Sequence, residues 1–337
     1  MARKAPFTAA SPEKSLSGCV YLITDLKGKG MNKKSQIKRK IKKSIPFYLM
    51  SLPAVVYLFI NNYLPMFGLV IAFKKIDYSL GILKSPWNGL NNFSYLFKTR
   101  DAWLIVRNTV GYNIIFITVG LIVSVTVAIL LSEITQKFLQ QTYQTCILIP
   151  YLLSIVMVSY LVFAFLGTES GILNKFRESI GLNKISWYST PKYWPFILVL
   201  VNTWKGFGYT SIVYFATIMG IDKSLYEAAA VDGATGWKQI RHITLPCLKP
   251  TIITLSLLAI GGMFHSDFGL FYQVPMNSGL LQDVTNTIDT YVYRGLVQLG
   301  KFTYTAAAGL YQSLVGFTLI LTANLIVRKI EPDSALF

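Results

Sequence analysis

Residues 224–250 read SLYEAAAVDGATGWKQIRHITLPCLKP and form a polar stretch between two strongly apolar ones. Ser224 is followed three positions later by Glu227, a spacing that predicts a capping box in which hydroxyl and carboxylate each bond to a backbone N–H. Good helix formers fill residues 225–231. Gly233 follows them and can adopt the left-handed conformation that ends a helix. The stretch therefore predicts a helix that stops at a sharp turn.

The chain after the turn predicts a second short helix over 237–244. Pro246 and Pro250 follow it and are expected to prevent its smooth continuation, because proline lacks the backbone N–H that a helix needs. Three alanines at 228–230 leave the first helix with a nearly bare surface, which another protein can approach closely. We therefore expect a stiff helical hairpin with an accessible face.

Composition places this hairpin in a membrane protein. Hydrophobic residues make up 53% of the 337 residues and charged ones only 14%, well below the share in soluble domains. The apolar runs are long enough to cross a bilayer, and they are continuous rather than alternating, which excludes a barrel. We expect an all-α membrane protein with six transmembrane helices, at about 46–73, 104–132, 142–166, 193–220, 250–270 and 304–327.

The net charge of +17 has a simpler explanation than nucleic-acid binding. A cluster of basic residues precedes the first apolar run, which is the positive-inside pattern of a cytoplasmic N-terminus. The cluster consists of Lys33, Lys34, Lys38, Arg39, Lys40, Lys42 and Lys43. With six spans, the hairpin and the C-terminus then also lie in the cytoplasm, although the basic residues of the predicted external loop 74–103 do not follow the rule.

The expected organisation follows from these spans. Residues 1–44 form a cytoplasmic N-terminal segment, in which either 1–30 is a loosely ordered extension or Met31 is the natural start. Residues 45–330 form the six-span domain, 222–249 its cytoplasmic loop, and 331–337 a cytoplasmic tail. The three cysteines, which are odd in number and scattered, predict neither a disulfide framework nor a metal site; they are Cys19, Cys146 and Cys247.

The polar stretch resembles the EAA loop of the permeases in bacterial binding-protein-dependent ABC importers. The resemblance rests on Glu227-Ala228-Ala229, Asp232-Gly233-Ala234, Ile243, Leu245-Pro246 and Pro250. In that family the loop is a coupling helix that sits in a cleft of an ATPase subunit. The resemblance thus implies that the coupling residues here are Ser224, Glu227, Ala228, Ala229, Asp232, Gly233, Ala234, Ile243, Leu245 and Pro246.

The predicted external segments extend the resemblance over about 45–337, nearly the whole chain. Trp87 and Gly89 in the first of them, Gly171 to Asn174 in the second, and residues 289–294 resemble the maltose-type sugar permeases, in the subgroup that handles oligosaccharides released from polysaccharides. The resemblance implies import of oligosaccharides delivered by an extracellular solute-binding protein. It also implies a location in the bacterial cell membrane.

Energy for such import is expected from partners. Residues 295–301 fit part of a phosphate-binding loop, but Phe302 stands where a hydroxyl should hold magnesium, and no strand precedes them. We therefore expect a transport subunit that is not an enzyme, with ATP and magnesium bound by two partner ATPase subunits and with a second, homologous permease beside it. The alternatives are a permease for a non-sugar solute and a secondary transporter without an ATPase, which should contain inverted repeats that we do not find.

The fourth apolar run carries the candidate substrate path. Lys205 lies about mid-depth in it, where a charge is costly unless it faces a cavity or a partner. The alternative is a lysine near the external end of the span, whose ammonium reaches the membrane interface. Trp204, Tyr209 and Tyr214 add aromatic faces on which sugar rings can stack, although contact with lipid or packing between helices is the commoner role of any single aromatic residue. His265 and Asp267, at the end of the fifth run, predict a pair at the external interface, with a proton relay as the alternative.

Overall fold

A computed structural model describes residues 33–77, 79–98, 100–298 and 300–330. The chain divides into two compact units, residues 1–67 and 68–337, and each is described by itself. The predicted extension 1–30, the tail 331–337 and Cys19 lie outside the described residues.

The described part of unit 1 is one long helix. α2 (Lys33–Leu58) passes into a π-helical turn, η1 (Phe59–Tyr63), and then into a 3₁₀ segment, η2 (Leu64–Phe73), which leads into unit 2. Residues 44–73 are long and apolar enough to cross a membrane, as predicted. Every side chain from 45 to 67 is exposed, and most of these side chains are apolar. Pro53 falls within the sequence of α2.

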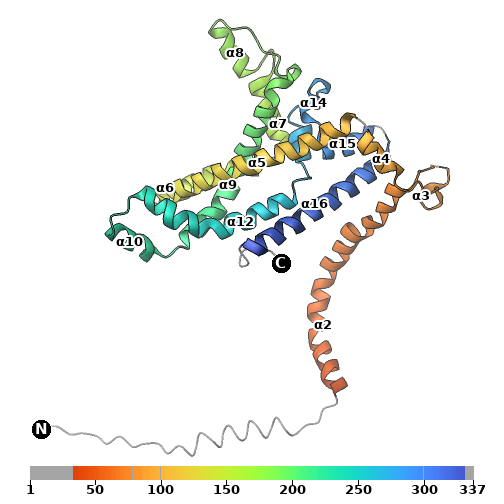
Figure 1. The fold of residues 1–337 in the computed structure, drawn as a ribbon, viewed down its shortest axis with the longest axis horizontal. Helices are drawn as coiled ribbons and strands as arrows, with labels where there is room; N and C mark the ends of the chain where they lie inside the picture. The colour runs from red at the N-terminus through yellow and green to blue at the C-terminus, as the bar shows by residue number, and fades with distance from the viewer. Residues whose placement is uncertain (1–32, 78, 99, 299, 331–337) are drawn as a thin grey trace, which may run out of the picture. The chain divides into compact units, whose positions relative to one another are not determined.

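Unit 2 contains four further helices that can cross a membrane. They are α5 (Arg100–Ser132), α9 (Trp194–Met219), the helix formed by α11 (Gly236–Gln239), η5 (Ile240–Thr244) and α12 (Leu245–Gly261), and α16 (Phe302–Ile330). The spans predicted at 104–132, 193–220 and 304–327 therefore correspond to single helices. α5 packs along α9, and α12 packs along α16 (Figure 1).

The remaining predicted span is bent. α6 (Lys137–Leu152) and α7 (Ile155–Leu166) meet at an angle of 93°, so the chain has five membrane-length helices, or six if this pair counts as one. Pro150 lies in the last turn of α6, and the Ser154 hydroxyl caps α7 by accepting a hydrogen bond from the Met157 N–H. The single span expected at about 142–166 is thus broken shortly after Pro150.

Short helices fill the connections between the long ones. They are α3 (Gly81–Lys84), α4 (Asn91–Lys98), α8 (Ile172–Ser179), η3 (Trp187–Ser189), η4 (Pro191–Tyr193), α10 (Lys223–Val231), α13 (Phe268–Tyr272), η6 (Gly279–Leu281), α14 (Gln282–Thr285), α15 (Ile288–Tyr293) and η7 (Arg294–Gln298). Within the described residues no segment forms a β-strand, which confirms the all-α class.

The largest buried cluster lies where α5, α7, α9 and α13 meet. Trp194 and Leu198 of α9 pack there against Val158 of α7 and Phe271 of α13, all of them fully buried. A second cluster around Tyr214 joins α5, α9 and α12. These two clusters fix α9 as the central helix of unit 2, with α10 following one of its ends and α8 preceding the other (Figure 1).

One prediction about the fifth span is wrong. Pro246 and Pro250 do not separate a short helix from it, because one continuous helix runs from Gly236 to Gly261. Pro246 lies in the first turn of α12, directly after the π-helical turn, where a missing N–H is tolerated. This span also ends at Gly261 rather than near residue 270.

Candidate functional site

The hairpin predicted at 224–250 begins with a different cap from the one expected. The Asp222 side chain, not that of Ser224, caps α10 by accepting a hydrogen bond of 3.0 Å from the Ser224 N–H. The expected capping box with Glu227 is therefore wrong, since the helix starts one residue before Ser224. The same hydrogen bond lowers the pKa of the exposed Asp222 carboxyl.

The turn after α10 has the predicted geometry. Gly233 has a φ of +72°, a left-handed conformation that a side chain would strain. Its N–H donates to the Ala230 carbonyl at 3.0 Å, and the Ala234 N–H donates to the Ala229 carbonyl at 2.8 Å. These two bonds are those of a Schellman motif, which satisfies the last carbonyls of the helix.

A side-chain contact fixes the two arms of the hairpin to each other. The Tyr226 hydroxyl and the buried Thr244 hydroxyl lie 2.9 Å apart, which joins α10 to the π-helical turn. The Gln239 amide donates to the Ala234 carbonyl at 3.3 Å and holds the turn against the second arm. The hairpin is thus stiffened by long-range side-chain bonds as well as by its turn.

The outer surface of the hairpin is unusually apolar for an exposed element. Val231 is 88% exposed, Trp237 71% and Leu225 48%. Glu227 and Ala228 are exposed between them. Of the other predicted coupling residues, three are partly buried and five are exposed. The partly buried ones are Ala229, Ala234 and Ile243, and the exposed ones are Ser224, Asp232, Gly233, Leu245 and Pro246. Large exposed apolar side chains rimmed by polar ones mark a protein-interaction surface.

Only two of the four residues predicted to form the substrate path, Lys205 and Tyr209, lie in one group. The Lys205 ammonium donates to the Tyr151 carbonyl at 3.1 Å and lies 5.6 Å from the centre of the Tyr151 ring. Tyr209 stacks on the same ring at 4.9 Å. Lys205, Tyr209 and Tyr151 therefore form one group where α6 meets α9, and Tyr151 is a member that sequence reasoning missed.

Trp204 and Tyr214 lie elsewhere. Trp204 lines an apolar groove between α7 and α9, and Tyr214 is 2% exposed in the cluster shared by α5, α9 and α12. Successive helix residues point about 100° apart, so Trp204 cannot share the direction of Lys205. Tyr214 packs the core, which was the alternative explanation for single aromatic residues.

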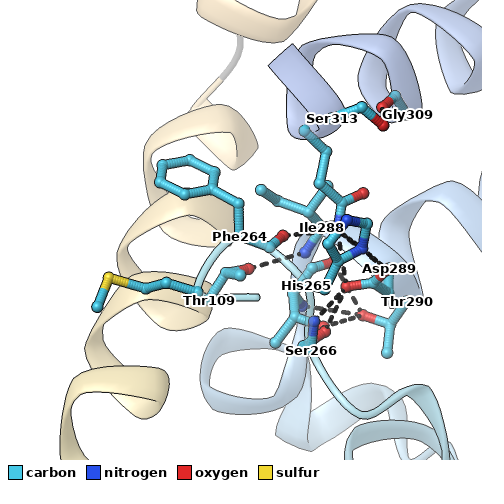
Figure 2. Close-up of polar contacts among 12 residues, drawn as sticks. Thr109, Phe264, His265, Ser266, Ile288, Asp289, Thr290, Gly309 and Ser313 are labelled. Atoms are coloured by element: carbon cyan, nitrogen blue, oxygen red, sulfur yellow. Dashed lines mark hydrogen bonds and ion pairs between the residues drawn. The ribbon is translucent and has the colours of Figure 1, made fainter. Parts of the chain in front are cut away.

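A polar cluster at the other end of the fifth span was not predicted. The Asp289 carboxylate of α15 accepts hydrogen bonds from the Ser266 N–H at 2.6 Å and the Ser266 hydroxyl at 2.8 Å (Figure 2). The His265 ring lies beside it, with 3.7 Å between Nδ1 and the carboxylate. Gln312 of α16 donates to the same carboxylate at 3.0 Å.

Two amides hold the chain where the fifth span stops. Residues 262–267 are not part of a regular helix, so their carbonyls need other donors. The Asn113 amide of α5 donates to the Met263 and His265 carbonyls, both at 3.0 Å, and Gln312 donates to the Phe264 carbonyl. The broken end is therefore fixed from α5, α15 and α16.

His265 and Asp267, the residues predicted as a pair at the external interface, bond to different partners. Asp267 caps α13 by accepting a hydrogen bond of 3.1 Å from the Leu270 N–H, while His265 faces Asp289 and Gln312. The signal that sequence reasoning could have used is a carboxamide inside an apolar run, as at Asn113 and Gln312. Its partners lie far away in the sequence and cannot be read from it.

A buried arginine organises the segment beside this cluster. Arg294 is 8% exposed, and its guanidinium donates to the side-chain oxygens of Asn277 and Asn286. Asn277 has a φ of 47°, and this strained backbone aims its amide at the guanidinium. Burial lowers the pKa of Arg294. Among the described residues no cluster of His, Cys, Asp or Glu could hold a metal ion.

Comparisons with known proteins agree over most of the chain. Residues 117–332 match the family described as binding-protein-dependent transport system inner membrane component. Protein LplB of Bacillus subtilis is 33% identical over 91% of this chain and 94% of its own. The polygalacturonan/rhamnogalacturonan transport system permease protein YteP of the same organism is 34% identical, covering 88% and 93%. A chain of a bacterial ABC transporter that imports the acidic polysaccharide alginate is 32% identical, with a TM-score of 0.80, covering 88% and 99%.

Proposed function

The chain belongs to the family of binding-protein-dependent transport system inner membrane components, and on that premise we propose that it is the permease subunit of an ATP-driven oligosaccharide importer. Relatives that support the substrate class transport polygalacturonan or rhamnogalacturonan, and arabinooligosaccharides. A related alginate transporter has been solved in complex with a periplasmic protein carrying an alginate pentasaccharide, which supports delivery by a solute-binding protein.

The hairpin of residues 222–249 is the proposed contact with an ATPase subunit, and its exposed apolar surface is the observation that carries the proposal. Val231 and Trp237 are too exposed for a surface that only meets water. Glu227 is exposed on α10, one helical turn before Val231, and is available to a cationic or N–H donor of the partner. The second arm continues into the fifth span, so displacement of the hairpin moves that span directly.

The proposed assembly follows from this contact. ATP and magnesium are bound by two ATPase subunits, and this chain pairs with a second, homologous permease around a central path. The bent pair α6 and α7 counts as one span, which gives six. The N-terminus, hairpin and C-terminus lie on the cytoplasmic side, in accordance with the basic cluster before the first span.

The group at Lys205 favours a substrate that carries carboxylates. Its ammonium bonds a neutral carbonyl, and no described carboxylate lies within ion-pair distance of it. Tyr151 and Tyr209 place stacked rings beside this charge. Aromatic faces suit sugar rings, and the free positive charge suits uronic acids, so we assign oligosaccharides with acidic sugars to this permease.

A purification and an uptake assay test the proposal together. The tagged chain should co-purify with an ATPase, and proteoliposomes of the complex should hydrolyse ATP faster when a solute-binding protein loaded with acidic oligosaccharide is added. Lys205→Gln should reduce the stimulation of ATP hydrolysis by acidic oligosaccharides more than that by neutral ones. The control Lys249→Gln, in the hairpin segment, should change the stimulation by acidic and by neutral oligosaccharides equally. Purification without any ATPase, combined with transport driven by an ion gradient, would favour the secondary transporter instead.

A further inference from the structure

A deep apolar groove faces outward between α7 and α9. It encloses about 620 Å³, and its walls are two helical stripes, Leu161 and Phe165 on α7 and Phe196 and Leu200 on α9. Phe196 is 75% exposed and Leu200 59%. The 93° bend between α6 and α7 turns α7 away from the line of α6 and leaves this space beside α9.

The groove is closed toward the middle of α9. One turn beyond Trp204, the backbone of α6 lies directly against Gly208, where an added Cβ would lie 1.9 Å from the Ile147 carbonyl oxygen. The groove therefore ends where α6 and α9 meet and does not run the full length of the span.

The length of the groove is that of one leaflet. From Lys192 to Trp204 the chain advances twelve residues, or about 18 Å at the helical rise. Half of the hydrocarbon core of a bilayer is about 15 Å thick. A transmembrane helix of a partner would need a groove along the whole span. One acyl chain fits a groove that is closed at one end and spans one leaflet.

The open end of the groove carries the only charged side chain of its lining. Lys192 lies there in η4, just before α9 enters the apolar region, and none of the described acidic residues forms an ion pair with it. Trp187 and Tyr193, whose rings lie 5.2 Å apart, surround the same end. Amphipathic aromatic residues mark the level of lipid headgroups.

We propose that this groove binds a phospholipid with an anionic headgroup. The acyl chain lies between α7 and α9, and the phosphate lies at the Lys192 ammonium, in the outer leaflet under the orientation proposed above. The acyl chain of such a lipid matches the apolar lining and the length of one leaflet. Its negative headgroup matches Lys192, the one charged residue of the lining. The inference depends on the chain crossing a membrane, but not on the substrate proposed above.

Photoactivatable lipids test the proposal. The chain, purified with its accompanying subunits in nanodiscs, is labelled with phosphatidylglycerol or phosphatidylcholine carrying the same diazirine acyl chain, and adducts are mapped by peptide mass spectrometry. Adducts on α7 and α9 should be about fivefold more abundant with phosphatidylglycerol, the effect expected of one lysine near an anionic lipid. Lys192→Gln should remove this preference, and Lys192→Arg should keep it.

Matched controls separate a specific site from general contact with lipid. Lys84→Gln, an exposed lysine in α3, should leave the preference unchanged. Leu200→Trp narrows the groove and should reduce adducts of both lipids. Equal labelling by both lipids in the wild type would overturn the proposal. So would p-benzoylphenylalanine at position 200 if it crosslinked to another subunit instead of to lipid.

Discussion

The helix of residues 236–261 begins among exposed side chains at the hairpin, whereas its other end stops at Gly261 in a break held by side chains of three other helices. At the first end, Val231 and Trp237 are directed to solvent and find no partner surface within their own unit. At the second end, Asp289 is surrounded by donors from the same chain.

This contrast separates two kinds of polar chemistry. The hairpin satisfies its backbone with bonds among its own residues and leaves the apolar side chains of Val231 and Trp237 exposed, which suits a surface that meets another molecule. The broken end uses side chains to satisfy its backbone, which suits a fixed joint. Changes at the hairpin should therefore affect transport more than stability, and changes at the broken end should do the reverse.

The largest effect is expected at the hairpin. Gly233→Pro cannot adopt the left-handed turn, and Glu227→Lys reverses the exposed charge, so either change should abolish uptake while the protein still reaches the membrane. Uptake of labelled oligosaccharide and membrane abundance check this. Gly236→Ala, where an added Cβ has open space, is the control. Uptake at the wild-type rate in both variants would contradict the coupling role.

The next effect is expected at the broken end. Gln312→Leu removes one donor to Asp289, which keeps its bonds from Ser266, and the side-chain donor to the Phe264 carbonyl; leaving that carbonyl unpaired costs about 1–3 kcal/mol. The melting temperature in detergent should fall by several degrees. Ser313→Ala, which loses only a bond within its own helix, should melt like the wild type. An unchanged melting temperature for Gln312→Leu would mean that the cluster does not hold this end.

A smaller effect is expected for the bond between the hairpin arms. Tyr226→Phe and Thr244→Val each remove one of the two hydroxyls, and a double-mutant cycle should give an interaction energy of about 1 kcal/mol. ATP hydrolysis stimulated by substrate should weaken severalfold in each single variant and no further in the double variant. Additive losses would show that the two hydroxyls act separately.

The smallest effect concerns pH at the far side from the hairpin. Burial raises the pKa of Tyr188 from its ordinary 10.0 to about 12, so the folded protein retains this proton more strongly than the unfolded one. The stabilisation is complete below pH 10 and is lost as pH rises toward 12. Between pH 10 and pH 12 the melting temperature of the wild type should therefore fall more than that of Tyr188→Phe, which has no hydroxyl to ionise. Parallel curves would mean that Tyr188 is not buried.

Local features of the hairpin could be predicted from the sequence. Gly233 at the end of a run of helix formers is sufficient to predict the turn, because the signal lies within a few residues. The cap was ambiguous for the same reason, since Asp222 and Ser224 are both good caps and lie two positions apart. The prediction that Pro246 interrupts the helix failed because a proline in the first turn of a helix is tolerated. The π-helical turn η5 places Pro246 in the first turn of α12.

Contacts between distant segments could not be predicted. Asn113, Ser266, Asp289 and Gln312 meet only after four separate segments have folded together, and each alone is an ordinary polar residue. The same holds for Tyr151 beside Lys205. Trp204 and Tyr214 were grouped with Lys205 because they share its helix, but the face of a helix that meets a cavity is set by its neighbours.

The continuous helix from Gly236 to Gly261 has a mechanical consequence. Its 26 residues make a rod of about 39 Å, free at the hairpin and fastened at the break. If the fastened end acts as a fulcrum, a rotation of about 10° sweeps the free end through roughly 7 Å, by the same rise per residue. A small displacement of the exposed hairpin would thus become a defined tilt of the whole helix.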